Sequence, residues 1–96
     1  MDNINIRGAN ALGKAMARLK TESLAMSMEA KLGICWHWQG DQLKFDTPRG
    51  AARGTSGMIS VDDTSVRVEI QLPALLRGFR GTVEGKIHDE LDRLLR

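Results

Sequence analysis

Residues 65–96, SVRVEIQLPALLRGFRGTVEGKIHDELDRLLR, decide the fold. From Val66 to Leu72 apolar and polar residues alternate, which is typical of a strand with one buried face. Pro73 ends this strand, because proline cannot donate to a sheet ladder. A final helix is expected to start near Thr82 as its N-cap, and its apolar residues recur at helical spacing: Val83, Ile87, Leu91, Leu94 and Leu95. This helix is the expected cover for the apolar face of the strand.

A long helix is predicted upstream, from about Ala9 to Lys31, after a short strand at residues 2–6. Strong helix formers dominate it, and Gly33 stands where a helix C-terminal glycine is expected. Its stripe of apolar and small residues advances by three and four positions: Ala9, Leu12, Met16, Leu19, Ser23, Met26 and Ala30. We expect this stripe to pack on the sheet. The alternative is a seam between two copies of the chain.

A β-hairpin is predicted in the middle of the chain, with strands at 34–39 and 42–46. Its two-residue connection, Gly40-Asp41, suits a type II′ turn. Trp36 and Trp38 share one face of the first strand, and we expect them to contribute most to the core. The glycine-rich stretch 47–57, TPRGAARGTSG, is a predicted loop, followed by a strand at 58–61.

These elements predict one α+β domain over residues 1–96, in the order β-α-β-β-β-β-α. A curved antiparallel sheet would pack against a long N-terminal helix and a C-terminal helix. The expected inner face of the sheet holds apolar residues of four strands: Trp36, Trp38, Leu43, Phe45, Ile59, Val61, Val66, Val68 and Ile70.

Composition excludes several classes of protein. A chain of 96 residues with 42% apolar content suits a single core. The only cysteine, Cys35, excludes an internal disulfide, and no run approaches the roughly 18 apolar residues of a membrane span. Neither is there the apolar segment of a secretory signal, so we expect a cytoplasmic protein. A net charge of +2 makes a nucleic-acid partner unlikely, because such proteins concentrate basic residues on one face.

No group of residues predicts catalysis, a metal site or a cofactor site. Cys35 and His37 point the same way from one strand, but a structural zinc site needs four ligands. A cysteine nucleophile needs a histidine facing its sulfur, which a neighbour on the same strand seldom provides. His88 and Asp92 lie one turn apart on the final helix, as on an ordinary solvated face. We therefore expect no enzyme.

Two segments could contact partners. Residues 75–80, here termed the elbow, interleave apolar and basic side chains, as surfaces that touch anionic amphiphiles do: Leu75, Leu76, Arg77, Phe79 and Arg80. The alternative is that the apolar residues of the elbow close one end of the core. Arg49 and Arg53, on the glycine-rich loop, could contact an anion, but no aromatic residues interleave there for base stacking.

Short motifs along nearly the whole chain carry a likeness to a known family. They are Ile4-Asn5-Ile6-Arg7, Leu12-Gly13 and Ala15, Trp38-Gln39-Gly40-Asp41 with Leu43 and Phe45, then Gly57, Ile59 and Val61, and most distinctively Leu72, Leu75-Leu76-Arg77, Phe79-Arg80-Gly81, Glu84, Ile87 and Leu91-Asp92. With them the chain resembles the polyhydroxyalkanoic acid system family, small bacterial proteins associated with polyhydroxyalkanoate granule genes. Residues 47–56 are longer than the family's usual connection. The resemblance implies a granule-associated accessory role and transfers no catalytic residue.

The function we expect is therefore that of a non-enzymatic accessory protein of polyhydroxyalkanoate storage. It would bind at or near granules, or their coat proteins, through the elbow and the final helix. One alternative is a domain that encloses a small hydrophobic ligand between sheet and helices, with the five methionines as an adaptable lining. The other is a weak nucleic-acid-binding module that uses the basic loop 47–57. Pairing into a homodimer stays open.

Overall fold

The computed structural model describes residues 2–50 and 53–94. Five strands and two α-helices form an α+β fold in the predicted order, with a short 3₁₀ helix (η1) before the last helix. The elements are β1 (Asp2–Ala9), α1 (Lys14–Leu32), β2 (Cys35–Gln39), β3 (Gln42–Asp46), β4 (Ser56–Val61), β5 (Ser65–Leu72), η1 (Ala74–Phe79) and α2 (Arg80–Leu94).

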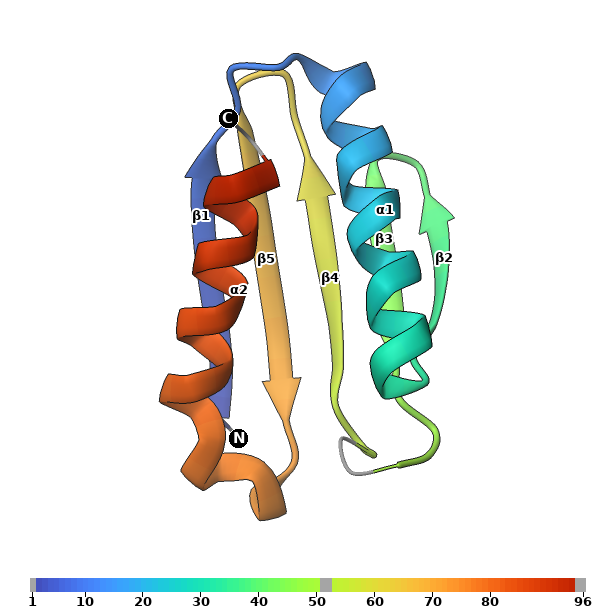
Figure 1. Cartoon of the computed structure of the whole chain (residues 1–96), viewed down its shortest axis with the longest axis vertical. Helices are drawn as coiled ribbons and strands as arrows, with labels where there is room; N and C mark the ends of the chain where they lie inside the picture. The colour runs from blue at the N-terminus through green and yellow to red at the C-terminus, as the bar shows by residue number, and fades with distance from the viewer. Residues whose placement is uncertain (1, 51–52, 95–96) are drawn as a thin grey trace.

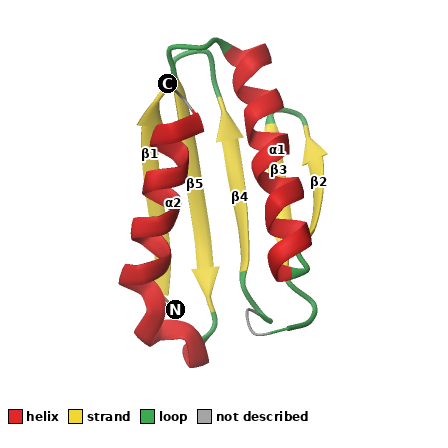
Figure 2. Cartoon of the chain, viewed as in Figure 1, coloured by secondary structure: helices red, strands yellow, loops and turns green. Residues whose placement is uncertain are grey.

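All neighbouring strands of the sheet run antiparallel, in the order β1-β5-β4-β3-β2. Hairpin connections join β2 to β3, β3 to β4 and β4 to β5. Strand β1 pairs with β5 and forms the edge of the sheet opposite β2. Both helices cover the same face of the sheet, α2 over β1 and β5, and α1 over the β3 side (Figure 1). Figure 2 shows that the opposite face carries no helix. The fold therefore has two layers, one of sheet and one of helices.

The core lies between these two layers. In β5, Val66, Val68 and Ile70 are buried while Arg67 and Gln71 are exposed, so the predicted alternation is confirmed. The other predicted inner-face residues of β3 and β4 are buried as well: Leu43, Phe45, Ile59 and Val61. Ile4 and Ile6 are buried too, on β1, the strand that α2 contacts.

Trp36 and Trp38 lie on the inner face as predicted and pack against the core, but they are partly rather than fully buried. They stand on β2, which is an edge strand, and their rings lie at the rim of α1. Each indole N–H donates to a glutamate of that helix, Trp36 to Glu29 Oε1 at 2.9 Å and Trp38 to Glu22 Oε1 at 3.1 Å. The tryptophans thus join the helix to the edge of the sheet rather than fill its centre.

Helix α1 begins at Lys14, not at Ala9, and the first strand extends to Ala9 instead of ending at Ile6. Asn10 stops the strand: its amide donates to the Asp62 carbonyl at 2.8 Å, and its side-chain oxygen accepts the Leu12 N–H at 2.9 Å. The predicted end of the helix is confirmed. Gly33 adopts a left-handed conformation, φ 73°, and its N–H donates to the Glu29 carbonyl.

The face of α1 that meets the sheet was predicted wrongly. Its buried residues are Ala17, Thr21 and Ala25, at helical spacing and all small. Three large residues of the predicted stripe point to solvent, Met16 with 46%, Leu19 with 61% and Met26 with 59% exposed. Small side chains let the helix lie close to the sheet, and the large side chains in this interface come from the strands and from Leu24 and Met28 of the helix.

Two smaller boundaries also differ. Thr82 lies inside α2 rather than at its start, because η1 runs directly into α2 at Arg80. Strand β4 begins at Ser56, which shortens the predicted loop. The β2–β3 hairpin is confirmed, with positive φ at Gly40 (63°) as a two-residue hairpin turn requires. Among the described residues, neither helix is long and apolar enough to cross a membrane.

Candidate functional site

The elbow connects β5 to α2 at one end of the molecule, where η1 turns the chain back over the sheet (Figure 1). Leu76 is half-buried and packs against the core, whereas Phe79 is 58% exposed. Arg77 and Arg80 are exposed, and both take part in further interactions within the molecule. The side chain of Leu75 lies outside the described part of the chain. One apolar residue of the elbow therefore helps to close the core and another faces solvent. Contact of the elbow with a partner stays a prediction.

Leu76 and Phe79 also line an apolar cleft between the two helices, with a volume of about 330 Å³. Helix α1 contributes Met28 and Leu32 to one wall, and η1 with α2 forms the other wall. The strands supply the floor, where Phe45 and Ile70 are buried beneath the cleft. The elbow is thus one lip of a groove that continues over the sheet between α1 and α2.

Two threonines belong to this otherwise apolar lining, with their hydroxyl oxygens buried behind its surface. Thr47 comes two residues after the inward Phe45, and Thr55 two residues before the inward Gly57, so strand alternation puts both on the inner face. Thr47 is only 4% exposed. Neither hydroxyl has a hydrogen-bond partner among the described residues. A buried hydroxyl without a hydrogen-bond partner costs about 1–3 kcal/mol of folding free energy. The two threonine hydroxyls are therefore unfavourable for the stability of the fold.

The floor of the cleft depends on a glycine. Gly57 stands opposite Phe45 in the β3–β4 register, and the phenyl ring lies across it. A Cβ at this position would come within 2.6 Å of the ring and 2.5 Å of the Glu69 carbonyl oxygen. Gly57 therefore lets the ring of Phe45 lie flat against the sheet.

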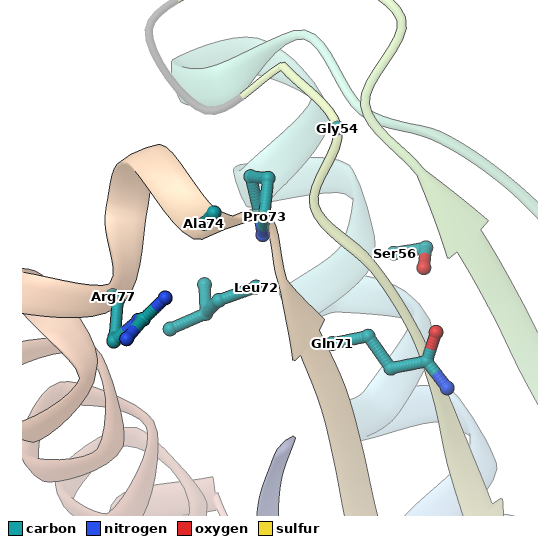
Figure 3. Close-up of a pocket in the computed structure, with 7 residues that line it drawn as sticks. All are labelled: Gly54, Ser56, Gln71, Leu72, Pro73, Ala74 and Arg77. Atoms are coloured by element: carbon teal, nitrogen blue, oxygen red, sulfur yellow. The ribbon is translucent and has the colours of Figure 1, made fainter. Parts of the chain in front are cut away.

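A second hollow, of about 710 Å³, lies at the same end of the molecule and is more polar (Figure 3). Ser56 and Gln71, which are opposite one another in the β4–β5 register, line it from one side, and Arg77 of η1 lines it from another. Leu72 belongs to the lining of both hollows. Arg77 of the elbow therefore borders the polar hollow, and Leu76 and Phe79 border the cleft.

The loop arginines stand apart from this lining. Arg49 and Arg53 are exposed on the β3–β4 connection, whose backbone turns through an Arg53 N–H donated to the Gly50 carbonyl at 3.1 Å. The structure places neither side chain in the cleft or the polar hollow. Their contact with an anion stays a prediction.

The residues weighed for catalysis and metal binding remain scattered. Cys35 and His37 are exposed on the sheet face that has no helix. His88 Nδ1 lies 3.4 Å from Asp92 Oδ2 on the exposed side of α2, as the one-turn spacing predicted. Within residues 2–50 and 53–94, no three side chains of the kinds that bind metals gather at one place.

An ionic cluster joins α1 to the β2–β3 turn. Asp41 accepts Lys14 Nζ at 3.0 Å and Arg18 Nη1 at 2.9 Å, and the Arg18 guanidinium lies 4.0 Å from the centre of the Trp38 ring. The hydrogen bond from Lys14 and the nearby positive charges hold the pKa of the Asp41 carboxyl below its ordinary value of 3.8. The same hydrogen bond raises the pKa of Lys14 above 10.5. This cluster orients the helix and has no connection with the cleft.

The outer surface of α1 exposes an apolar ridge in the positions predicted to face the sheet. Met16, Leu19 and Met26 follow one another along it at spacings of three and seven residues. Such a ridge is what a seam between two copies would use. The homodimer stays a prediction.

Sequence reasoning found the elbow but missed the threonines and the opposite wall of the cleft. Thr47 and Thr55 stood inside a segment assigned wholly to a flexible loop. Counting by twos from Phe45 and Gly57 would have placed both on the inner face. Met28 escaped notice because the wrong stripe of the long helix was assigned to the sheet.

One comparison with known proteins identifies relatives of the chain. A family model described as "Putative polyhydroxyalkanoic acid system protein" matches residues 4–95. No curated protein and no solved structure matches the chain. The match includes the elbow, both helices and all the strands that form the cleft.

Proposed function

This chain belongs to the polyhydroxyalkanoic acid system family, and from that membership we propose that it is a non-enzymatic accessory protein of polyhydroxyalkanoate storage. It binds at or near the granule surface, or to proteins that coat it, in the cytoplasm. The elbow is the contact, with Phe79 entering an apolar surface and Arg77 and Arg80 beside it. Family membership supplies the biological context, and the elbow supplies the physical means.

The observation that carries this proposal is the exposure of Phe79. An aromatic side chain that is 58% exposed leaves apolar area in water, and its burial would contribute up to about 1.5–3 kcal/mol. It stands at the lip of the apolar cleft, so the surface that could enter a hydrophobic phase extends beyond one residue. The adjacent arginines favour anionic groups around such a phase. Together these features suit reversible association rather than permanent anchoring.

Co-sedimentation with isolated granules tests the proposal. Phe79→Gln removes the exposed ring, and we expect several-fold less protein in the granule fraction. Leu19→Gln is the matched control, because Leu19 is equally exposed but lies on the outer side of α1. This control should be recovered like the parent.

Circular dichroism establishes beforehand that all three proteins are folded. If Phe79→Gln and the parent sediment equally, the elbow is not the contact. If the parent itself stays in the supernatant, the association with granules is refuted.

A further inference from the structure

We propose that a second copy of this chain packs against the outer face of α1, with the two α1 helices side by side and parallel. The outer face is the set of exposed residues on the side of the helix opposite the sheet: Ala15, Met16, Leu19, Ser23, Met26, Ser27 and Ala30. The inference goes beyond the proposed contact with granules and does not depend on it, because the elbow belongs to η1 and the start of α2, not to α1.

Helix α1 has an uncharged face on each side, and the sheet covers one of them. Ala17, Thr21 and Ala25 are buried against the sheet. At 3.6 residues per turn, the outer face lies half a turn away from these three residues. The structure describes every residue of α1, and none of the seven residues of the outer face is charged, although 27% of the chain is. A continuous uncharged and largely apolar face of this kind marks an interaction site.

The spacing of residues along the outer face is that of a seam between two helices. Met16, Leu19, Ser23, Met26 and Ala30 follow one another by three and four positions, the heptad spacing at which helices pack side by side. The 19 residues of α1 give a contact about 28 Å long and about 10 Å wide. This is smaller than a standard interface of about 800 Å² per partner, so we expect weak and reversible pairing.

The charged residues that flank the outer face favour the parallel orientation. Glu22 and Glu29 form one flank, on the side of β2, where they accept the two indole N–H groups. Lys20 and Lys31 form the other flank, at the same angular distance from the centre of the face. In a parallel pair, the acidic flank of each copy lies beside the basic flank of the other. In an antiparallel pair, flanks of like charge would meet, which is unfavourable.

A hollow on the acidic flank has room for a basic side chain of the second copy. Its volume is about 460 Å³, and Ala15, Arg18 and Glu22 belong to its lining. The small side chain of Ala15 leaves the hollow open, and Arg18 is already paired with Asp41. In the parallel pair, heptad geometry brings Lys20 of the second copy next to Ala15, within reach of the Glu22 carboxylate.

The acidic flank also argues against an anionic lipid or granule surface as the occupant of the outer face. Helices that lie on such surfaces carry lysine and arginine on their polar face. Glu22 and Glu29 would be repelled by the surface, whereas a second copy of the chain offers lysines to them.

Sedimentation velocity on the full chain, from about 1 µM to about 1 mM, tests the pairing. A reducing agent is present because Cys35 is exposed and could form disulfides. We expect a monomer at the lowest concentration and a dimer at the highest. A monomer over the whole range would overturn the proposal.

Two substitutions locate the seam. Leu19→Gln should shift the midpoint of dimerisation to at least about tenfold higher concentration. Phe79→Gln is the matched control, because Phe79 is similarly exposed but lies on the elbow, and it should dimerise like the parent. Circular dichroism at about 1 µM, where the parent is dissociated, should show that all three proteins are folded.

If Leu19→Gln dimerises like the parent, or if Phe79→Gln is the variant that fails to dimerise, the seam is not on α1. The same two variants have opposite roles in the granule assay. Failure of one proposal is therefore distinguishable from failure of the other.

Single cysteines introduced into the Cys35→Ser chain determine the orientation. In a parallel pair each seam residue meets its own counterpart, so Met16→Cys and Ala30→Cys should each form a disulfide-linked dimer on oxidation. Disulfides that form only when these two variants are mixed would show an antiparallel pair and overturn the parallel orientation. Thr82→Cys, exposed on α2, is the control and should stay unlinked. Equal crosslinking of this control would show that random collision produces the disulfides and would overturn the seam.

Discussion

At the scale of single residues, the backbone spacing beside Gly57 controls the packing of the core. Gly57→Ala would place a methyl group against both the Phe45 ring and the Glu69 carbonyl. Because the carbonyl belongs to the adjacent strand, it cannot move without disturbing the ladder. We expect this variant to lose about 1–3 kcal/mol of unfolding free energy in urea denaturation.

Gly85→Ala is the control for this substitution. Gly85 lies in α2, and a Cβ there meets nothing within 4 Å. Alanine in a helix should stabilise the protein by about 0.5–1 kcal/mol relative to glycine. If the two alanine variants change stability by the same amount in the same direction, the close approach of Phe45 to Gly57 is wrong.

At the scale of elements, the orientation of α1 follows from the size of its residues rather than from their hydrophobicity. Ala25 is fully buried against the sheet, and Leu19 is exposed on the opposite side. Ala25→Leu should therefore push the helix away and cost about 1–3 kcal/mol, although it adds apolar surface. Leu19→Gln should change stability by less than about 0.5 kcal/mol, although it removes apolar surface.

Thermal melts of these two variants measure the prediction. The orientation of the helix would be the reverse of that described if Leu19→Gln were destabilised and Ala25→Leu were not. In that case the predicted stripe would be the buried one after all.

At the scale of the whole molecule, Asp41 holds the helical layer to the sheet layer by binding Lys14 and Arg18. Its pKa is lowered in the folded state, so its contribution to stability is present above the unfolded value of 3.8 and is lost as the pH falls through the lower folded value. Asp41→Asn should therefore melt below the parent near neutral pH. The difference should narrow steadily in acid as the carboxyl of the parent is protonated.

Asp46→Asn is the control for charge, since Asp46 is another exposed aspartate of the same hairpin. Its melting temperature should follow that of the parent across the whole pH range. A constant difference between parent and Asp41→Asn at all pH values would show that the effect of the substitution is not electrostatic.

The sequence by itself determined the kinds and order of the elements and the inner face of the central strands. Alternation in β5 and helical spacing in α2 are local patterns, and burial followed them closely. The position of the elbow was also predictable, because Pro73 and the mixed apolar and basic composition mark a connection between two elements. Which of its apolar residues is exposed was not predictable from the sequence.

Only the tertiary structure decided which side of α1 is buried and that a cleft exists. The large apolar residues of α1 and its small residues both repeat at helical spacing. The sequence of the helix does not determine how closely it approaches the sheet, and that approach selects the buried side. The distance between α1 and the sheet depends on the side chains of β2 and β3 that face the helix. These are the two tryptophans at the edge of the sheet and Phe45, whose ring lies over Gly57. Likewise Thr47 and Thr55 line the same cleft as Leu76 and Phe79 only because β5 pairs with β4 and returns the chain to this end of the sheet. A cleft is a property of several distant segments together, so no single stretch of sequence specifies it.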